Sequence, residues 1–155
     1  MEQRTKITAE PGKQDFVINR EFELPLELLF KAYTEADLLE QWMGTKVLKL
    51  ENKKHGSWQF ETSDAKGNVV LRMNGAIHDF VPNHKITRTF EMENAPFGAQ
   101  LEFLEFEKLS DEASKLTIHT LFKSAELRDK MLKLGMAPGI NMAHNRLQEI
   151  LIKQI

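Results

Sequence analysis

Arg88 is the polar residue whose position most clearly suggests binding chemistry. It falls between Ile86 and Phe90 on the apolar side of an alternating stretch. A guanidinium that loses its water needs a partner, because burying an unpaired charge is costly. A ligand carboxylate could be held there by two parallel hydrogen bonds. Two other interpretations stay open: an internal ion pair with Glu102 or Glu105, or an arginine near the sheet edge whose head group reaches water.

His144 is the second candidate, for proton transfer. It follows Ile140 by one helical turn and precedes Leu147 on an apolar stripe. A histidine that faces a cavity could act as an acid or a base. The alternative is a histidine that only hydrogen-bonds at the border of its helix.

Other chemistry-bearing patterns are missing from the sequence. The five histidines have no close paired spacing of the kind that holds a metal. The absence of cysteine excludes disulfides, thiolate metal sites and a cysteine nucleophile. Isolated Gly67 and Gly75 make no phosphate loop, and no serine lies in a nucleophile-elbow sequence. We therefore predict neither a metal nor a cofactor.

The overall composition restricts the class of partner. A net charge of −2 and a pI of about 6.2 disfavour general attraction to nucleic acid or to an anionic membrane. No apolar run approaches the ~18 residues of a membrane helix, and the N-terminus lacks the apolar core of a signal peptide. We expect a cytoplasmic protein in which residues 1–155 form one domain, with residues 1–13 as a loosely ordered lead-in that contains at most a short strand.

The elements that must position these residues begin with a strand over residues 16–22, where Arg20 interrupts an otherwise apolar face. Pro25 suits the first turn of a helix, and apolar spacing continues to residue 33. Thr34 and Asp37 have the spacing of a capping box, which predicts the start of a second short helix. Gly44 is a suitable terminator for it.

A period of two between residues 46 and 123 predicts antiparallel strands joined by polar turns. The strand over residues 101–106 is ambiguous. Leu101 and Phe103 share one face, whereas Leu104 and Phe106 share the other. Either a bulge brings both pairs to one side, or part of the second face is covered. Glu102, with Glu105 and Glu107, is expected to be solvated.

Helical spacing returns after Ser124, a suitable N-cap. A short stripe that includes Met131 and Leu134 ends at Gly135. Pro138 and Gly139 then interrupt or restart the helix, and a longer apolar face runs to residue 151.

The order and spacing of these features resemble the START-like (SRPBCC) superfamily, in the branch named after the C-terminal domain of the heat-shock-protein-ninety ATPase activator. The residues that carry the resemblance are Arg20, Phe22, Pro25, Leu29, Phe30, Ala32, Thr34, Trp42, Gly56, Trp58, Phe60, Gly67, Gly75, Pro82, Gly139, Asn141, Arg146 and Leu147. It implies an α+β helix-grip fold, in which a curved antiparallel sheet of about six or seven strands surrounds a long C-terminal helix.

The resemblance also implies function classes. Members often bind a small apolar or aromatic molecule between helix and sheet, and some are cyclases or hydrolases, so the fold leaves function open. The activator itself has a separate N-terminal domain for which this chain has no room, which makes a co-chaperone role less expected.

We therefore predict a protein, monomeric or homodimeric, that binds a small hydrophobic or aromatic molecule. The alternatives are a hydrolase or cyclase that uses the same cavity, and a chaperone-associated interaction module. No catalytic residue is assigned. The predicted ligand-binding residues are Trp42, Trp58, Phe60, Met73, Arg88, Phe90, Ile118, Met131, Met136, Ile140 and His144.

Overall fold

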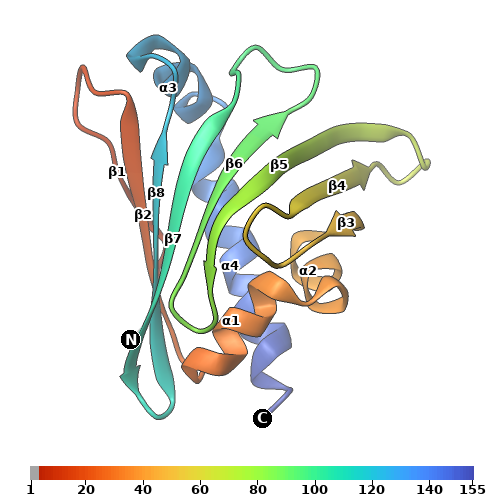
Figure 1. The fold of residues 1–155 in the computed structure, drawn as a ribbon, viewed down its shortest axis with the longest axis vertical. Helices are drawn as coiled ribbons and strands as arrows, with labels where there is room; N and C mark the ends of the chain where they lie inside the picture. The colour runs from red at the N-terminus through yellow and green to blue at the C-terminus, as the bar shows by residue number, and fades with distance from the viewer. Residues whose placement is uncertain (1–3) are drawn as a thin grey trace.

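The computed structural model describes residues 4–155, which form one antiparallel sheet and four helices (Figure 1). The elements in chain order are β1 (Lys6–Thr8), β2 (Asp15–Phe22), α1 (Leu26–Thr34), α2 (Ala36–Met43), β3 (Lys46–Leu50), β4 (Ser57–Ser63), β5 (Val69–Val81), β6 (Lys85–Met92), β7 (Gln100–Ser110), β8 (Ala113–Leu121), α3 (Ala125–Leu132) and α4 (Met136–Ile152).

The sheet has the strand order β1-β2-β8-β7-β6-β5-β4-β3 and bends around α4 (Figure 1). Strands β3 to β8 follow one another as hairpins, and β2 closes the series by pairing with β8. This architecture confirms the predicted helix-grip fold. The sheet has eight strands rather than six or seven, because the lead-in contributes β1.

The lead-in is attached to the body of the fold within its described part. Strand β1 pairs with β2, and the backbone N–H of Thr5 donates to Oδ1 of Asn141 on α4 at 3.0 Å. The short strand expected in this segment is therefore present. Residues 1–3 lie outside the described residues.

The ambiguous strand β7 runs without a bulge where one was considered. Its register with β8 is continuous from Leu101 to Lys108, so the bulge interpretation is wrong. Leu104 and Phe106 are buried in the core, and Phe103 lies on the opposite face beside the ring of His119. Even-numbered residues of β7 therefore face the helices, and part of the outer face is covered.

The start of α2 differs from the prediction. Its N-cap is Glu35, which makes no side-chain cap bond, so the capping box of Thr34 and Asp37 is wrong. The Thr34 hydroxyl instead donates to the carbonyl of Phe30 at 2.9 Å, at the end of α1. Gly44 ends α2 in the left-handed conformation, as predicted.

The C-terminal part of the chain forms two separate helices, α3 and α4, rather than one continuous helix. Ser124 caps α3 by accepting from the N–H of Leu127, as predicted. Helix α4 begins directly after Gly135, and Pro138 lies in its first turn, where no backbone N–H is required. Leu134 lies between the helices and is 66% exposed, so its predicted place on the inward stripe is wrong.

Helix α4 packs unevenly along its length. Leu147 and Leu151 are completely buried, whereas Ile140 and Ala143 in its first half are only partly buried. Its main neighbours are α1, α2, α3 and β1 rather than the central strands. The first half of α4 therefore spans the concave face of the sheet without filling the space beneath it.

Gly75 offers a test of how the sheet positions its aromatic residues. It lies opposite Trp58 in the β4–β5 pair, and a Cβ there would collide with the carbonyl oxygen of Thr89 and lie 2.6 Å from the Trp58 indole nitrogen. We expect Gly75→Ala to lower the free energy of unfolding by at least about 2 kcal/mol, measured by urea denaturation.

The matched control is Gly139→Ala in α4, where a Cβ meets nothing within 4 Å. This change should leave stability unchanged or raise it by about 0.5–1 kcal/mol, because alanine favours helix. Equal effects of the two substitutions would contradict the close approach at Gly75.

Candidate functional site

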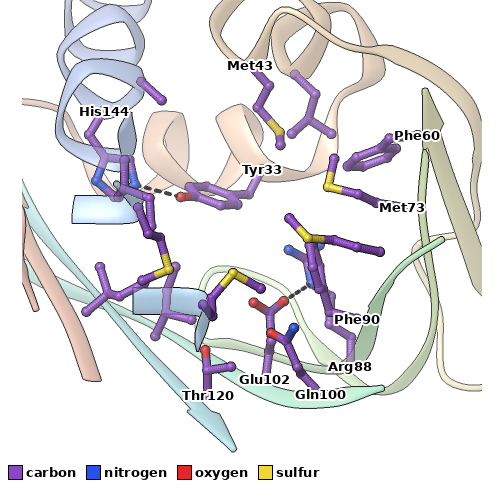
Figure 2. Close-up of a pocket in the computed structure, with 18 of the residues that line it drawn as sticks. Tyr33, Met43, Phe60, Met73, Arg88, Phe90, Gln100, Glu102, Thr120 and His144 are labelled. Carbon is purple, nitrogen blue, oxygen red and sulfur yellow. Dashed lines mark hydrogen bonds and ion pairs between the residues drawn. The ribbon is translucent and has the colours of Figure 1, made fainter. Parts of the chain in front are cut away.

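A cavity of about 280 Å³ lies between the inner face of the sheet and α4 (Figure 2). Its walls come from β2, β4 to β8 and all four helices, and they are mostly apolar. The lining residues are Phe16, Ile18, Tyr33, Leu39, Trp42, Met43, Phe60, Met73, Arg88, Phe90, Met92, Gln100, Glu102, Ile118, Thr120, Met131, Met136, Ile140, Ala143 and His144.

Ten of the eleven residues predicted from the sequence lie in this wall; Trp58 does not. Trp58 is buried behind it, packed against Phe60 and Phe90. The guanidinium carbon of Arg88 lies 4.7 Å from the centre of the Trp58 ring, a cation–π arrangement. Trp58 thus supports a lining residue instead of facing the cavity.

Arg88 has a partner within the protein. Its Nε donates to Oε1 of Glu102 at 2.9 Å, and the two residues lie opposite each other on β6 and β7. Each side chain is 14% exposed. Of the three interpretations of Arg88, the internal ion pair is the one observed, and the expectation that Glu102 is solvated is wrong.

His144 faces the cavity from α4 and is held at both ring nitrogens. Nε2 lies 3.1 Å from the Tyr33 hydroxyl, and Nδ1 lies 2.7 Å from the Thr5 hydroxyl (Figure 2 shows the Tyr33 contact). Burial, and then the nearby charge of Arg20, lower the pKa of His144 to about 3. Burial also raises the pKa of Tyr33 above its usual range. Both side chains are therefore neutral near pH 7.

Arg20 joins the same region of the fold. It is buried on β2, and its Nη1 donates to Oδ1 of Asn141 at 3.2 Å and to the Thr5 hydroxyl at 3.4 Å. Its guanidinium also lies over the Phe22 ring. The interruption that Arg20 makes in the apolar pattern thus marks the point where the lead-in, β2 and α4 meet.

Sequence reasoning missed four polar residues of the cavity wall, Tyr33, Gln100, Glu102 and Thr120, of which Gln100 and Thr120 are the most deeply buried. These two are 4% and 1% exposed. Gln100 Nε2 and Thr120 Oγ1 have no hydrogen-bond partner among residues 4–155. The alternation of β8 placed Thr120 on the inward face and could have singled it out. Gln100 had no such signal, because the facing of β7 was unresolved.

Residues 4–155 contain neither a metal-binding cluster nor a membrane-spanning helix. No group of three or more histidine, aspartate or glutamate residues within 4–155 lies close enough to hold a metal ion. No helix in that range is long and apolar enough to cross a membrane.

Comparison with protein families identifies the group to which this architecture belongs. Residues 23–152 match the family model described as activator of Hsp90 ATPase homolog 1-like protein. The chain belongs to this family. The match spans α1 to α4 and includes most of the cavity wall, and it agrees with the START-like resemblance of the sequence.

Solved structures share the fold at low sequence identity. A crystal structure of a protein from Rhodobacter sphaeroides has a TM-score of 0.83 at 21% identity, covering 96% of this chain and 99% of the other. A protein from Mycobacterium smegmatis has a TM-score of 0.83 at 18% identity, covering 96% of both chains. A solution structure from Arthrobacter aurescens has a TM-score of 0.84 at 18% identity, covering 96% and 91%. No curated protein sequence matches this chain.

The buried state of His144 predicts a pH dependence of stability. Its pKa is about 3 in the folded protein and close to 6.5, the ordinary value of a solvated histidine, in the unfolded chain. Below pH 6.5 the unfolded chain binds a proton that the folded chain does not, so stability is complete above pH 6.5 and decreases as the pH falls toward 3. Between pH 7 and 5 we expect a loss of about 2 kcal/mol from this group.

Urea denaturation of the wild type and of His144→Gln over this pH range measures the contribution. Glutamine keeps hydrogen-bonding capacity but does not titrate, so the difference between the two stability curves should change with pH. Parallel curves would show that His144 does not have a strongly lowered pKa.

Proposed function

We propose that this protein binds a small apolar or aromatic molecule in the cavity between the sheet and α4. The observation that carries the proposal is the cavity itself: about 280 Å³, close to the roughly 300 Å³ at the lower end of ligand pockets, with mostly apolar walls and a few polar groups. Such a space suits a compact ligand of one or two rings.

The methionine content of the wall supports binding of an irregular or variable ligand. Five of the seven methionines in the sequence line the cavity. They are Met43, Met73, Met92, Met131 and Met136. Methionine side chains are flexible and polarisable, so they adapt to the shape of what they contact.

Proton-transfer catalysis by His144 receives less support. A general acid or base works best when its pKa lies near the working pH. Burial and Arg20 lower the pKa of His144 to about 3, and both ring nitrogens have partners, Tyr33 and Thr5. The geometry thus favours a positioning role for His144 within a binding protein.

An interaction module would require a continuous apolar surface. The large apolar side chains that are exposed are distributed over several elements, including Leu48 on β3, Val70 on β5, Leu109 on β7 and Met142 on α4. This distribution does not favour a docking function over a cavity function.

The binding proposal can be tested by filling the cavity. Ala143 lines it from α4, so Ala143→Phe places a ring inside. With naphthalene as probe at about 100 times its dissociation constant, we expect the wild type to gain about 2.7 kcal/mol, seen as a rise in melting temperature of several degrees. Ala143→Phe should lose this rise.

Ala137→Phe is the matched control, because Ala137 lies on the exposed side of the first turn of α4 and does not line the cavity. It should retain the full shift. Circular dichroism establishes that both variants fold. A panel of naphthalene and its alkyl derivatives that never stabilises the wild type would refute the proposal, as would equal shifts in the two variants.

A further inference from the structure

Four polar side chains gather on the sheet side of the cavity, opposite His144 (Figure 2). Arg88 lies opposite Glu102 in the β6–β7 pair, and Glu102 lies opposite Thr120 in the β7–β8 pair. Gln100 precedes Glu102 by two residues and so shares its face. These four residues, the polar floor, form one continuous group across three strands.

The charges of the polar floor cancel. Arg88 and Glu102 form an ion pair at 2.9 Å. The other titratable residues that line the cavity are Tyr33 and His144, and both are neutral near pH 7. A carboxylate ligand in the cavity would therefore compete with Glu102 for Arg88. The ligand carboxylate and the Glu102 carboxylate would also repel each other.

The polar floor, in contrast, contains hydrogen-bond donors that have no acceptor among the described residues. Gln100 Nε2 and Thr120 Oγ1 are buried and have no partner among residues 4–155. Buried donors almost always have a partner, because an unsatisfied one keeps its full desolvation cost. Both atoms carry a hydrogen that they can donate.

We infer that the natural ligand is a neutral molecule that carries a hydrogen-bond acceptor, such as a carbonyl oxygen, beside an apolar or aromatic body. The acceptor receives hydrogen bonds from Gln100 and Thr120, and the apolar body contacts the methionine and phenylalanine side chains. This inference rests on the proposed binding function and specifies the ligand class. It differs from the carboxylate ligand considered from the sequence, because Arg88 already forms an ion pair with Glu102 through its Nε.

A pocket that hydrogen-bonds its ligand discriminates strongly against an analogue without the acceptor, because the donors of the pocket are then left unpaired. Three probes of one shape separate the possibilities: 2-acetylnaphthalene has a neutral acceptor, 2-isopropylnaphthalene has none, and 2-naphthoate has a charge. Calorimetric titration gives the dissociation constant of each.

For the wild type we expect 2-naphthoate to bind at least about tenfold more weakly than 2-acetylnaphthalene. Thr120→Val and Gln100→Leu should each weaken 2-acetylnaphthalene relative to 2-isopropylnaphthalene by roughly tenfold. Each should also raise the melting temperature of the ligand-free protein, by roughly 2–4 °C, because a buried unpaired donor is removed.

Thr87→Val is the matched control. Thr87 lies on β6 next to Arg88 and so faces the outer side of the sheet. The same chemical change there should leave the ratio of the two dissociation constants unchanged.

A second variant, Glu102→Gln, tests the charge argument, because it releases Arg88 from its partner. It should strengthen the binding of 2-naphthoate at least about tenfold relative to that of 2-acetylnaphthalene.

The outcomes separate the inference from the proposed function. Suppose that 2-isopropylnaphthalene binds, and that Thr120→Val and Gln100→Leu leave the ratio of the 2-acetylnaphthalene and 2-isopropylnaphthalene dissociation constants at its wild-type value. The inferred ligand class is then wrong, although the cavity does bind small apolar molecules. Tighter binding of 2-naphthoate than of 2-acetylnaphthalene by the wild type would likewise overturn it. If none of the three probes binds, the inference and the binding function both fail.

Discussion

The structure depends on how α4 is held over the concave face of the sheet. Leu147 and Leu151 are completely buried, and they fix the second half of the helix in the core formed with α1 and α2. The first half places Met136, Ile140 and Ala143 against the cavity. These side chains are too few and too small to fill the space between α4 and the concave face of the sheet. The cavity follows from this mismatch between a bent sheet and the single helix α4 that crosses its concave face (Figure 1).

Polar contacts hold the first half of α4 where apolar packing is thin. Asn141 accepts from Arg20 and from the Thr5 backbone, and His144 contacts Thr5 and Tyr33. These bonds are directional, so they fix the distance between α4 and the sheet without occupying the space between them. The low pKa of His144 is the electrostatic consequence of placing this network away from water.

Alternation along the strands made most of the sheet side of the cavity wall predictable. Phe60, Met73, Phe90 and Ile118 face the cavity because they lie on the apolar side of their strands. The strand β7 shows the limit of this reasoning. Its two faces are almost equally apolar, so the pattern could not place Glu102 inside. Glu102 and Glu105 therefore remained equal candidates for the partner of Arg88, and Gln100 was not recognised. The contact between Thr5 and His144 could not be predicted for another reason: the two residues are 139 positions apart in the sequence.

The polar floor also explains why a glycine in β5 bears on the site. Gly75 leaves room for the Trp58 indole, and the face of that ring lies under the guanidinium of Arg88. Arg88 is thereby held toward Glu102, and the charge of each neutralises the other. The two charges are thus paired within the cavity wall, and under the proposed binding function the uncharged groups of the wall would determine selectivity for a ligand. Under that proposal, hydrogen-bond geometry rather than net charge would distinguish one small apolar molecule from another.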